Sequence, residues 1–506
     1  KEQPLSSGYF KNSHILKIIY PSFELYYYAS FIKKNKILYA CVKGTTAHIS
    51  PLDITFKNSH GEVSIHQYQF NNGNQAEKFF LISFSDSLHQ HNDTLLSGRQ
   101  LVRPEEELSY MQNVFSSCHF PSGINTQERN LIEQSIALLM MAQVADNEIF
   151  PYAQGQVLAS LRPGVWSISW VRDAAFAIEA MSKTGLYKEA KAGLEFMLKA
   201  KPVNQINHYI HTDGKDYGVG VPYIISITRY FGNGREECDY AGNDGPNIEL
   251  DGLGLFLTAL YHYINESGDT EFLKKWLTEI ETIANAIVHN ITTNKVIRRD
   301  SGPWEHHLPG KEYVWTTGVN ARGLQLLTIL MKHAGMPFKK YEEAYLQLME
   351  GIYKNFVVNN YYIKGNVQDN DPLSQHYFDA ASIELFANGL IQDKKLFSTH
   401  MKEYNRHLRA VQDDKRGYIR FNSSNSYENQ EWPFAGLRVA VAQLKLGNKK
   451  EAAKLINRIT AFASRNNNQI PEILDNETNI YKGAIPMIGY GAGAYIIAVA
   501  EQKKNK

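Results

Sequence analysis

The stretch NESGDTEF, residues 265–272, joins two segments whose apolar residues recur at helical spacing. The first segment ends near Ser267, Gly268 follows, and the second segment begins near Thr270. A glycine placed just past a helix adopts the left-handed conformation that ends it. A connection this short makes the second helix run antiparallel to the first. The stretch therefore predicts a helical hairpin.

Three other short connections also place a glycine just past a predicted helix. The glycines are Gly185 in SKTGLYKEA (182–190), Gly335 in KHAGMPFKK (332–340) and Gly447 in LKLGNKKEA (444–452). The fifth short connection, LIQDKKLF (390–397), lacks such a glycine.

From about residue 126 onward, the periodicity of apolar residues predicts twelve helices. Their approximate ranges are 126–145, 171–184, 187–200, 249–267, 270–290, 313–336, 338–357, 378–391, 395–412, 432–447, 449–466 and 487–501. Long and short links alternate between them. Six hairpins joined in this way predict a mainly α protein with an (α/α)6 barrel, whose long loops all emerge at one end. A repeat solenoid is the alternative, but the long loops are too unequal for a regular array.

The first 100 residues have the pattern of strands. HILKIIY (14–20), ELYYYASF (24–31) and KFFLISFS (78–85) are short, β-branched or aromatic, and separated by polar turns. We expect a smaller antiparallel β-sandwich domain over residues 1–100, a helical linker over 101–125, and the barrel over 126–506.

The composition excludes several classes of protein. The 506 residues are 43% hydrophobic and 21% charged with a net charge of +1, so nucleic acid and anionic membranes are not expected partners. The apolar stretch 483–500 contains several Gly and a Pro, and a buried helix is favoured over a membrane span.

The cysteines give little information about the compartment. Cys41, Cys118 and Cys238 are scattered, which argues against a disulfide framework and against a thiolate zinc site. A secreted or periplasmic location is expected, with the cytosol as the alternative. A first residue that is not Met fits either a removed leader or a trimmed chain. The oligomeric state is left open.

Unusual residue combinations gather in the long links. These are RPGVWSISWVRDA (162–174), YAGNDGPNIELDG (240–252), SGPWEHH (301–307), GYIRF (417–421) with NQEWPF (429–434), and IPEILD (470–475). They hold four of the six tryptophans, namely Trp166, Trp170, Trp304 and Trp432. Long loops on a rigid scaffold are where sites usually lie, so one face of the barrel is predicted to carry the function.

Aromatic rings next to carboxylates and arginines suit a sugar ligand, because pyranose faces pack on aromatic rings and hydroxyls need polar partners. Glu305 and Glu472, from different loops, would then meet across a glycosidic bond. Glu305 beside Trp304 suits the acid, because an apolar neighbour favours a protonated carboxyl. Glu472 lies in a polar loop and suits the role of the general base.

Each motif also has a simpler interpretation. Glu305 could be an ordinary solvated loop carboxylate, or a metal ligand with His306 and His307, although adjacent side chains point in different directions. Asp173 could merely complement the positive end of a helix. Glu472 could cap a turn or face solvent.

Taken together and in this order, the motifs of residues 126–501 resemble glycoside hydrolase family 15, the glucoamylase-type enzymes. WSISWVRDAAF is similar to the segment whose Arg and Asp hold the terminal glucose, here Arg172 and Asp173, with Trp166 and Trp170 as wall aromatics. GNDGP and IELDGLG are similar to segments of fungal and bacterial members, with Glu249 where Gln is usual.

The later motifs continue the resemblance. It implies that Glu305 is the general acid, beside Trp304, and that Glu472 is the general base. It also places Arg420, Trp432 and Tyr490 in the pocket. His306 departs from the pattern, because many relatives have a second acidic residue there. We still expect it to contact substrate and to affect linkage preference.

The resemblance implies an inverting exo-acting hydrolase that releases glucose from non-reducing ends of α-glucans or malto- or isomalto-oligosaccharides, without a metal or other cofactor. The linkage and chain-length preferences stay open. The alternatives are another (α/α)6 carbohydrate-active enzyme, of trehalase or phosphorylase type, and a non-catalytic scaffold that binds oligosaccharide.

Overall fold

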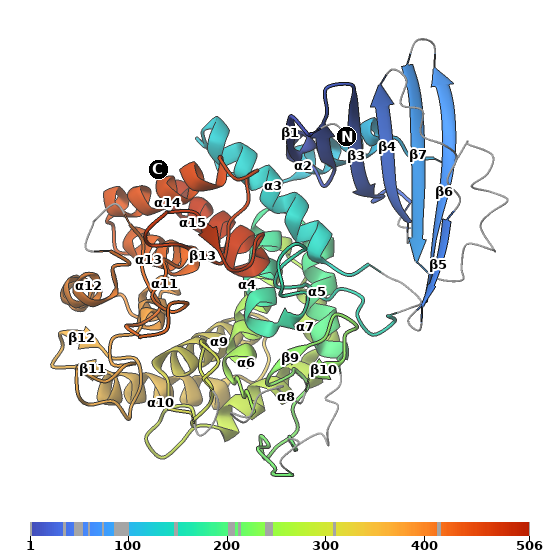
Figure 1. The fold of residues 1–506 in the computed structure, drawn as a ribbon. Helices are drawn as coiled ribbons and strands as arrows, with labels where there is room; N and C mark the ends of the chain where they lie inside the picture. The colour runs from blue at the N-terminus through green and yellow to red at the C-terminus, as the bar shows by residue number, and fades with distance from the viewer. Residues whose placement is uncertain are drawn as a thin grey trace. The chain divides into compact units, whose positions relative to one another are not determined.

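The structure is a computed structural model. It describes residues 3–33, 37–44, 54–58, 61–72, 75–84, 101–145, 150–200, 208–210, 214–237, 246–306, 310–411 and 416–504. The chain divides into two compact units, Lys1–Cys118 and His119–Lys506, and each is described by itself (Figure 1).

The first unit is an antiparallel sheet of seven strands in the order β1-β2-β3-β4-β7-β6-β5. The strands are β1 (Ser6–Tyr9), β2 (Leu16–Ile19), β3 (Phe23–Ala29), β4 (Ile37–Gly44), β5 (Ile54–Asn58), β6 (Gly61–Asn72) and β7 (Gln75–Phe84). In the register of β3 on β4, Tyr28 lies opposite Tyr39, and their rings stack with centroids 5.3 Å apart. Cross-strand aromatic pairs of this kind stabilise a sheet face.

Helix α2 (Pro104–Ser117) belongs to this unit. Its Leu108 joins the buried cluster of Tyr28, Tyr39 and Phe79 on the sheet. The predicted antiparallel β domain is therefore confirmed. In the described residues its strands form one sheet, and α2, which we expected to be only a linker, packs where a sandwich would have a second sheet.

The second unit contains the predicted helices. They are α3 (Thr126–Ala142), α4 (Val171–Lys183), α5 (Tyr187–Lys199), α6 (Asp251–Ser267), α7 (Thr270–Lys275), α8 (Leu277–His289), α9 (Val314–His333), α10 (Lys339–Asn355), α11 (Glu384–Ala387), α12 (Lys394–Leu408), α13 (Pro433–Lys445), α14 (Lys449–Ala463) and α15 (Ala494–Lys504). Small paired strands lie in the loops: β8 (Ser169–Trp170) with β9 (Arg229–Tyr230) and β10 (Glu236–Glu237), β11 (Val357–Val358) with β12 (Tyr362–Ile363), and β13 (Ile473–Leu474) with β14 (Tyr481–Lys482).

Six of these helices form a closed inner ring. Helices α4, α6, α9, α11, α13 and α15 each contact the next, and α15 contacts α4. Helices α3, α5, α8, α10 and α14 pack against the ring from outside, and Phe397 of α12 contacts Phe386 of α11. The predicted (α/α)6 barrel is confirmed, and the long loops lead into the N-termini of the inner helices (Figure 1).

The four glycines predicted to end helices adopt the expected left-handed conformation. Gly185, Gly268, Gly335 and Gly447 have φ values of 83°, 74°, 68° and 94°. At the fifth short turn the predicted helix end was wrong. The helix expected over 378–391 is short and already ends at Ala387, and Gly389 follows it with a φ of 81°.

Two other predicted segments are less regular than expected. The segment 270–290 is broken at Trp276 into α7 and α8. The last segment begins as a π-helical turn, Ile488–Gly493, before α15.

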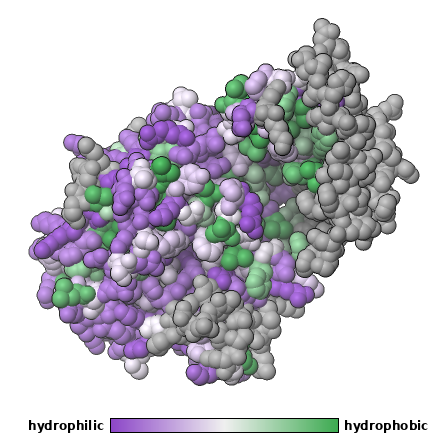
Figure 2. All heavy atoms as spheres, viewed as in Figure 1, coloured by the Kyte–Doolittle hydropathy of each residue, from purple (hydrophilic) through white to green (hydrophobic). Residues whose placement is uncertain are grey.

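Inner helices are buried nearly all round because ring neighbours and outer helices cover them. In α13, residues from Pro433 to Leu444 are all buried. The 483–500 stretch is likewise interior, with Ile496 and Val499 buried. Among the helices of the described residues, none has the length and apolarity needed to cross a bilayer. Polar side chains cover most of the helical unit on the face shown in Figure 2.

Candidate active site

A cavity of about 350 Å³ lies where the loops before the inner helices meet. Every predicted site residue except His306 lines it: Trp166, Trp170, Arg172, Asp173, Trp304, Glu305, Arg420, Trp432, Glu472 and Tyr490. The wall also contains residues that the sequence argument did not single out, among them Arg229, Tyr427 and Glu428.

Helix α4 brings its first turn to the cavity. Trp170 is the N-cap, and Arg172 and Asp173 lie in the first turn. Trp170 also pairs with Arg229 across β8 and β9, and the Arg229 guanidinium lies 5.0 Å from the Trp170 ring centroid. This short strand pairing fixes one wall of the cavity.

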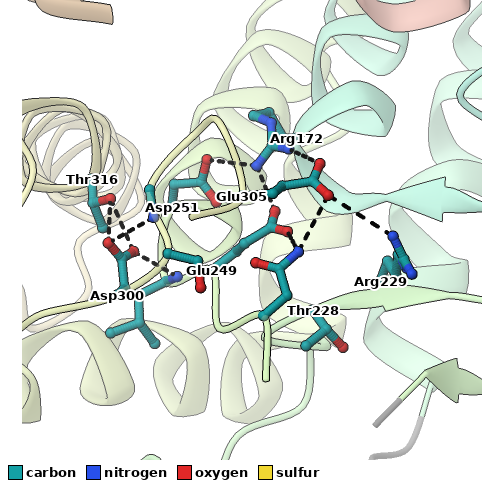
Figure 3. Close-up of polar contacts among 12 residues, drawn as sticks. Arg172, Thr228, Arg229, Glu249, Asp251, Asp300, Glu305 and Thr316 are labelled. Atoms are coloured by element: carbon teal, nitrogen blue, oxygen red, sulfur yellow. Dashed lines mark hydrogen bonds and ion pairs between the residues drawn. The ribbon is translucent and has the colours of Figure 1, made fainter. Parts of the chain in front are cut away.

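The loop that carries Glu305 is tied to the segment before α6. The Ser301 amide donates to the Ile248 carbonyl (2.7 Å), and the Ile248 amide donates to Ser301 Oγ (2.9 Å). Asp300 accepts from the amide of Leu250 at 3.1 Å and from the hydroxyl of Thr316. Burial raises the pKa of Asp300 to about 8. These contacts place the Glu305 loop directly against residues 247–251 (Figure 3).

Glu305 itself has φ of +60°, in the left-handed region that non-glycine residues rarely adopt. Such backbone strain clusters at functional positions, where the surrounding structure holds it in place. In this protein the hydrogen bonds of loop 300–306 to residues 248 and 250 hold the backbone of Glu305 in this conformation.

The Glu305 carboxylate lies among positive and amide groups (Figure 3). Arg172 Nη2 is 3.1 Å from Oε1, Asn247 Nδ2 is 3.3 Å from Oε2, and Arg229 Nη1 is 3.8 Å from Oε2. Trp304 directs its indole N–H to Asp379 Oδ1 at 2.8 Å. The sequence argument for an apolar neighbour therefore missed the main feature of this site, which is charge.

Arg172 is the centre of this network. Its Nη1 lies 2.5 Å from Glu249 Oε2 and 3.3 Å from Asp251 Oδ2, and its side chain is 3% exposed. Trp315 on α9 donates to the same Asp251 oxygen at 2.7 Å. One guanidinium thus holds three carboxylates, those of Glu249, Asp251 and Glu305.

Glu472 has different surroundings. Its Oε1 accepts from Trp166 Nε1 (2.9 Å) and from the Tyr427 hydroxyl (2.6 Å), and its Oε2 accepts from the Ala484 amide (3.0 Å). Its own amide donates to the Ala484 carbonyl at 2.8 Å. The carboxylate is oriented by neutral donors and stays 9% exposed to the cavity.

Asp173 lies on the cavity wall between these groups. Burial raises the pKa of Asp173 to about 7, opposed by Arg172 and assisted by the charges of Glu305 and Glu472. Tyr490, in the π-helical turn, stacks on Phe434 with centroids 3.6 Å apart and lies 5.9 Å from the Arg172 guanidinium.

Another part of the cavity wall is built around Arg420. Its guanidinium lies 3.5 Å from the Trp432 ring centroid and 4.7 Å from that of Trp304. Its Nη1 is 3.3 Å from Glu428 Oε2. Flat aromatic faces with charged hydrogen-bonding groups at their edges are suited to a sugar ring.

His306 does not line the cavity. Its ring lies 4.2 Å from that of His376 and 5.3 Å from that of Phe421. The expected direct contact with substrate is therefore not what the structure shows, because the chain reverses after Glu305 and the His306 amide donates to the Ser301 carbonyl at 2.9 Å.

No cluster of three or more metal-ligating side chains is present within the described ranges. His307, the third member of the considered metal triplet, lies outside them, as do Cys238 and all of GNDGP except Pro246.

Sequence reasoning missed several of the residues that surround the two candidate glutamates. Asn247 and Asp251 are in a motif that we quoted, but no role was assigned to them. Tyr427 and Glu428 precede the quoted NQEWPF, and their aromatic-acid pairing resembles Trp304-Glu305. Arg229 lies in β9, a strand of two residues, which is too short to give a periodic signal in the sequence.

Residues 139–446 match the family described as Glycosyl hydrolases family 15. The chain belongs to this family. The match runs from the end of α3 to the end of α13 and so includes Glu305 and the Arg172 network. Glu472 lies beyond it.

The chain is also similar in sequence to a trehalase. Trehalase 1 of Sulfolobus acidocaldarius is 24% identical over 327 residues, which cover 63% of this chain and 53% of that protein. The chain therefore matches about half the length of this relative.

Solved structures share the fold. A bacterial glucoamylase complexed with acarbose superposes with a TM-score of 0.71 at 13% identity, covering 99% of this chain and 86% of that one. A glycosidase described as wild type gives a TM-score of 0.58 at 15% identity, covering 75% of this chain and 99% of that one. These similarities show the fold, and membership of the family shows a glycosidase.

Proposed function

We propose that the protein hydrolyses α-glucosidic bonds at non-reducing chain ends with inversion and releases glucose. The observation that carries this proposal is the pair Glu305 and Glu472 on one cavity. One carboxylate is held by guanidinium groups and the other by neutral donors, as two carboxyl groups with different tasks require.

In this mechanism Glu305 donates its proton to the glycosidic oxygen as the bond to the anomeric carbon breaks. Glu472 removes a proton from a water that attacks the opposite face of the sugar. Inverting enzymes hold the two carboxyl groups roughly 6.5–9.5 Å apart, which leaves room for that water. The Glu472 carboxylate already accepts three hydrogen bonds, so its remaining lone pair points to one position for the water.

Arg172 and Asp173 are suited to hold the hydroxyls of the terminal glucose, since both are buried at the cavity wall. The aromatic faces of Trp170, Trp432 and Tyr490 enclose the ring. A cavity at the N-terminal ends of a closed helical ring accepts the end of a glucan and excludes its middle.

Trehalose is the second candidate substrate. The similarity to a trehalase supports it, and the same acid and base would cleave an α,α-1,1 bond. The two candidates differ only in what the aglycone side accepts.

The test is a hydrolysis panel of maltose, isomaltose, trehalose and maltodextrins, with the anomer of the released glucose followed by NMR. From maltose, isomaltose and maltodextrins we expect the glucose unit of the non-reducing end to be released as the β-anomer, and from trehalose we expect one β- and one α-glucose, because the leaving glucose keeps its α-configuration. Release of the non-reducing-end glucose as the α-anomer, or two α-glucose molecules from trehalose, would contradict inversion. No hydrolysis of any member of the panel would contradict the function. A phosphorylase would need added phosphate, and an oligosaccharide-binding scaffold would bind without turnover.

A further inference from the structure

We propose that Glu249 is a positioning residue that keeps the general acid Glu305 protonated, by competing with it for the charge of Arg172. This inference rests on the proposed role of Glu305. It assigns a task to a carboxylate that cannot itself reach the glycosidic bond, because it does not line the cavity.

The geometry makes the competition direct (Figure 3). Arg172 presents Nη1 to Glu249 at 2.5 Å and Nη2 to Glu305 at 3.1 Å. Arg172 and Glu249 are each 3% exposed, whereas Glu305 is 25% exposed. Asn247 Nδ2 bridges the two acids, 2.7 Å from Glu249 Oε1 and 3.3 Å from Glu305 Oε2. The shorter and more deeply buried contact is the one to Glu249.

A general acid must hold its proton before the substrate arrives, and an adjacent guanidinium favours the ionised form. Two guanidiniums face Glu305, so the site needs negative charge behind them. Arg229 is neutralised by its buried ion pair with Glu237. Arg172 is neutralised by Glu249 and, at 3.3 Å, by Asp251.

The other charged groups around the cavity are mainly acidic. Asp173, Glu472 and Glu428 line it, and the charge of Arg420 is met by Glu428 at 3.3 Å. Burial lowers the pKa of Arg172, but the charges of nearby carboxylates, Glu249 first among them, outweigh it and raise that pKa well above its usual range.

The test is the pH dependence of kcat for Glu249→Gln, which keeps the shape of the side chain and removes its charge. Arg172 then keeps only Asp251 and Glu305 as charged partners, so it stabilises the ionised form of Glu305 more strongly. The basic limb of the profile moves to lower pH, by about one unit, and kcat on the acidic side changes little. Glu249→Asp keeps the charge and leaves the basic limb within a few tenths of a unit of wild type.

Two further comparisons separate this role from a general loss of structure. Glu384→Gln breaks an equally buried pair outside the cavity, in which Arg438 Nε and Nη2 lie 2.7 and 2.6 Å from Glu384, and it leaves the limb in place. With α-glucosyl fluoride, whose leaving group needs no proton, the Glu249→Gln shift disappears, because the acid is no longer required.

A basic limb that stays in place or moves upward in Glu249→Gln overturns the inference. If that variant does not fold, Glu237→Gln tests the same argument through Arg229, with a smaller shift in the same direction. Loss of this shift is distinct from failure of the proposed function, which would appear as undiminished hydrolysis by Glu305→Gln.

Discussion

The two candidate catalytic carboxylates differ in how the protein controls them. Glu305 lies on a strained, pinned loop among Arg172, Arg229 and Asn247. Glu472 lies beside β13 and accepts hydrogen bonds from Trp166, Tyr427 and a backbone amide. Charge acts on the first, and neutral donors orient the second.

This difference matters because an acid and a base need opposite protonation states at one pH. Neutral hydrogen-bond donors favour the ionised form of a carboxylate without adding charge to the cavity. Guanidinium groups favour it too, so Glu305 can act as an acid only if other carboxylates offset them. The groups around each glutamate, rather than the glutamate itself, would therefore determine whether it acts as the acid or as the base.

The largest expected effect comes from removing each carboxylate in turn. Glu305→Gln and Glu472→Gln each lower kcat on maltose or trehalose by about 10²–10⁴-fold. The two variants differ in their rates on α-glucosyl fluoride. Because fluoride leaves without a proton, the rate of Glu305→Gln stays within about tenfold of the wild-type rate. Glu472→Gln stays inactive, because the attacking water still needs the base. Initial rates on both substrates measure this. Equal losses on the fluoride for both variants would contradict the division of roles.

A smaller effect is expected from Tyr427→Phe, which removes one donor from Glu472. A hydrogen bond to a charged group is worth about 1.5–3 kcal/mol, so kcat falls by about tenfold or more. The lost bond had favoured the ionised base, so the acidic limb of the pH profile moves to higher pH while the basic limb stays. Trp166→Phe is the matched control on the same oxygen and should shift the same limb. Movement of the basic limb instead would mean that the two carboxylates are not controlled separately.

The smallest effect on activity is expected at the contact between the two halves of the site. Gly489, in the turn that follows the Glu472 loop, packs so closely on α4 that an added Cβ would lie 1.9 Å from the Asp173 carbonyl oxygen. Gly489→Ala forces α4 and this turn apart and lowers the unfolding free energy by about 1–3 kcal/mol, with a loss of activity of a few-fold. Thermal unfolding measures it.

Gly436 in α13 is the control for this substitution, because, apart from its chain neighbours and its own helix backbone, no atom of the described residues lies within 4 Å of a Cβ added there. Gly436→Ala should be neutral or stabilising by up to about 1 kcal/mol. Similar destabilisation by both variants would show that the close contact at Gly489 is not the cause.

Much of the fold was predictable because its signals are local. Apolar spacing and the glycines at positions 185, 268, 335 and 447 depend only on neighbouring residues, and they predicted the hairpins and the ring. The break at Trp276 and the short α11 were missed, because packing on neighbouring helices overrides a continuous apolar pattern. The single sheet of the first unit was missed because strand pairing is non-local.

The sequence by itself determined which loops and which two glutamates are the candidates for the chemistry, since Trp-Glu and Pro-Glu stand out within their own segments. Only the tertiary structure decided what surrounds those glutamates. Glu305 is 58 residues away from Asn247 in the sequence. It meets Asn247 and Glu249 because Ser301 and Asp300 bond the backbone of residues 248 and 250. The charge that an acid experiences depends on distances of a few ångströms, and such distances are set by packing across the chain rather than by order along it.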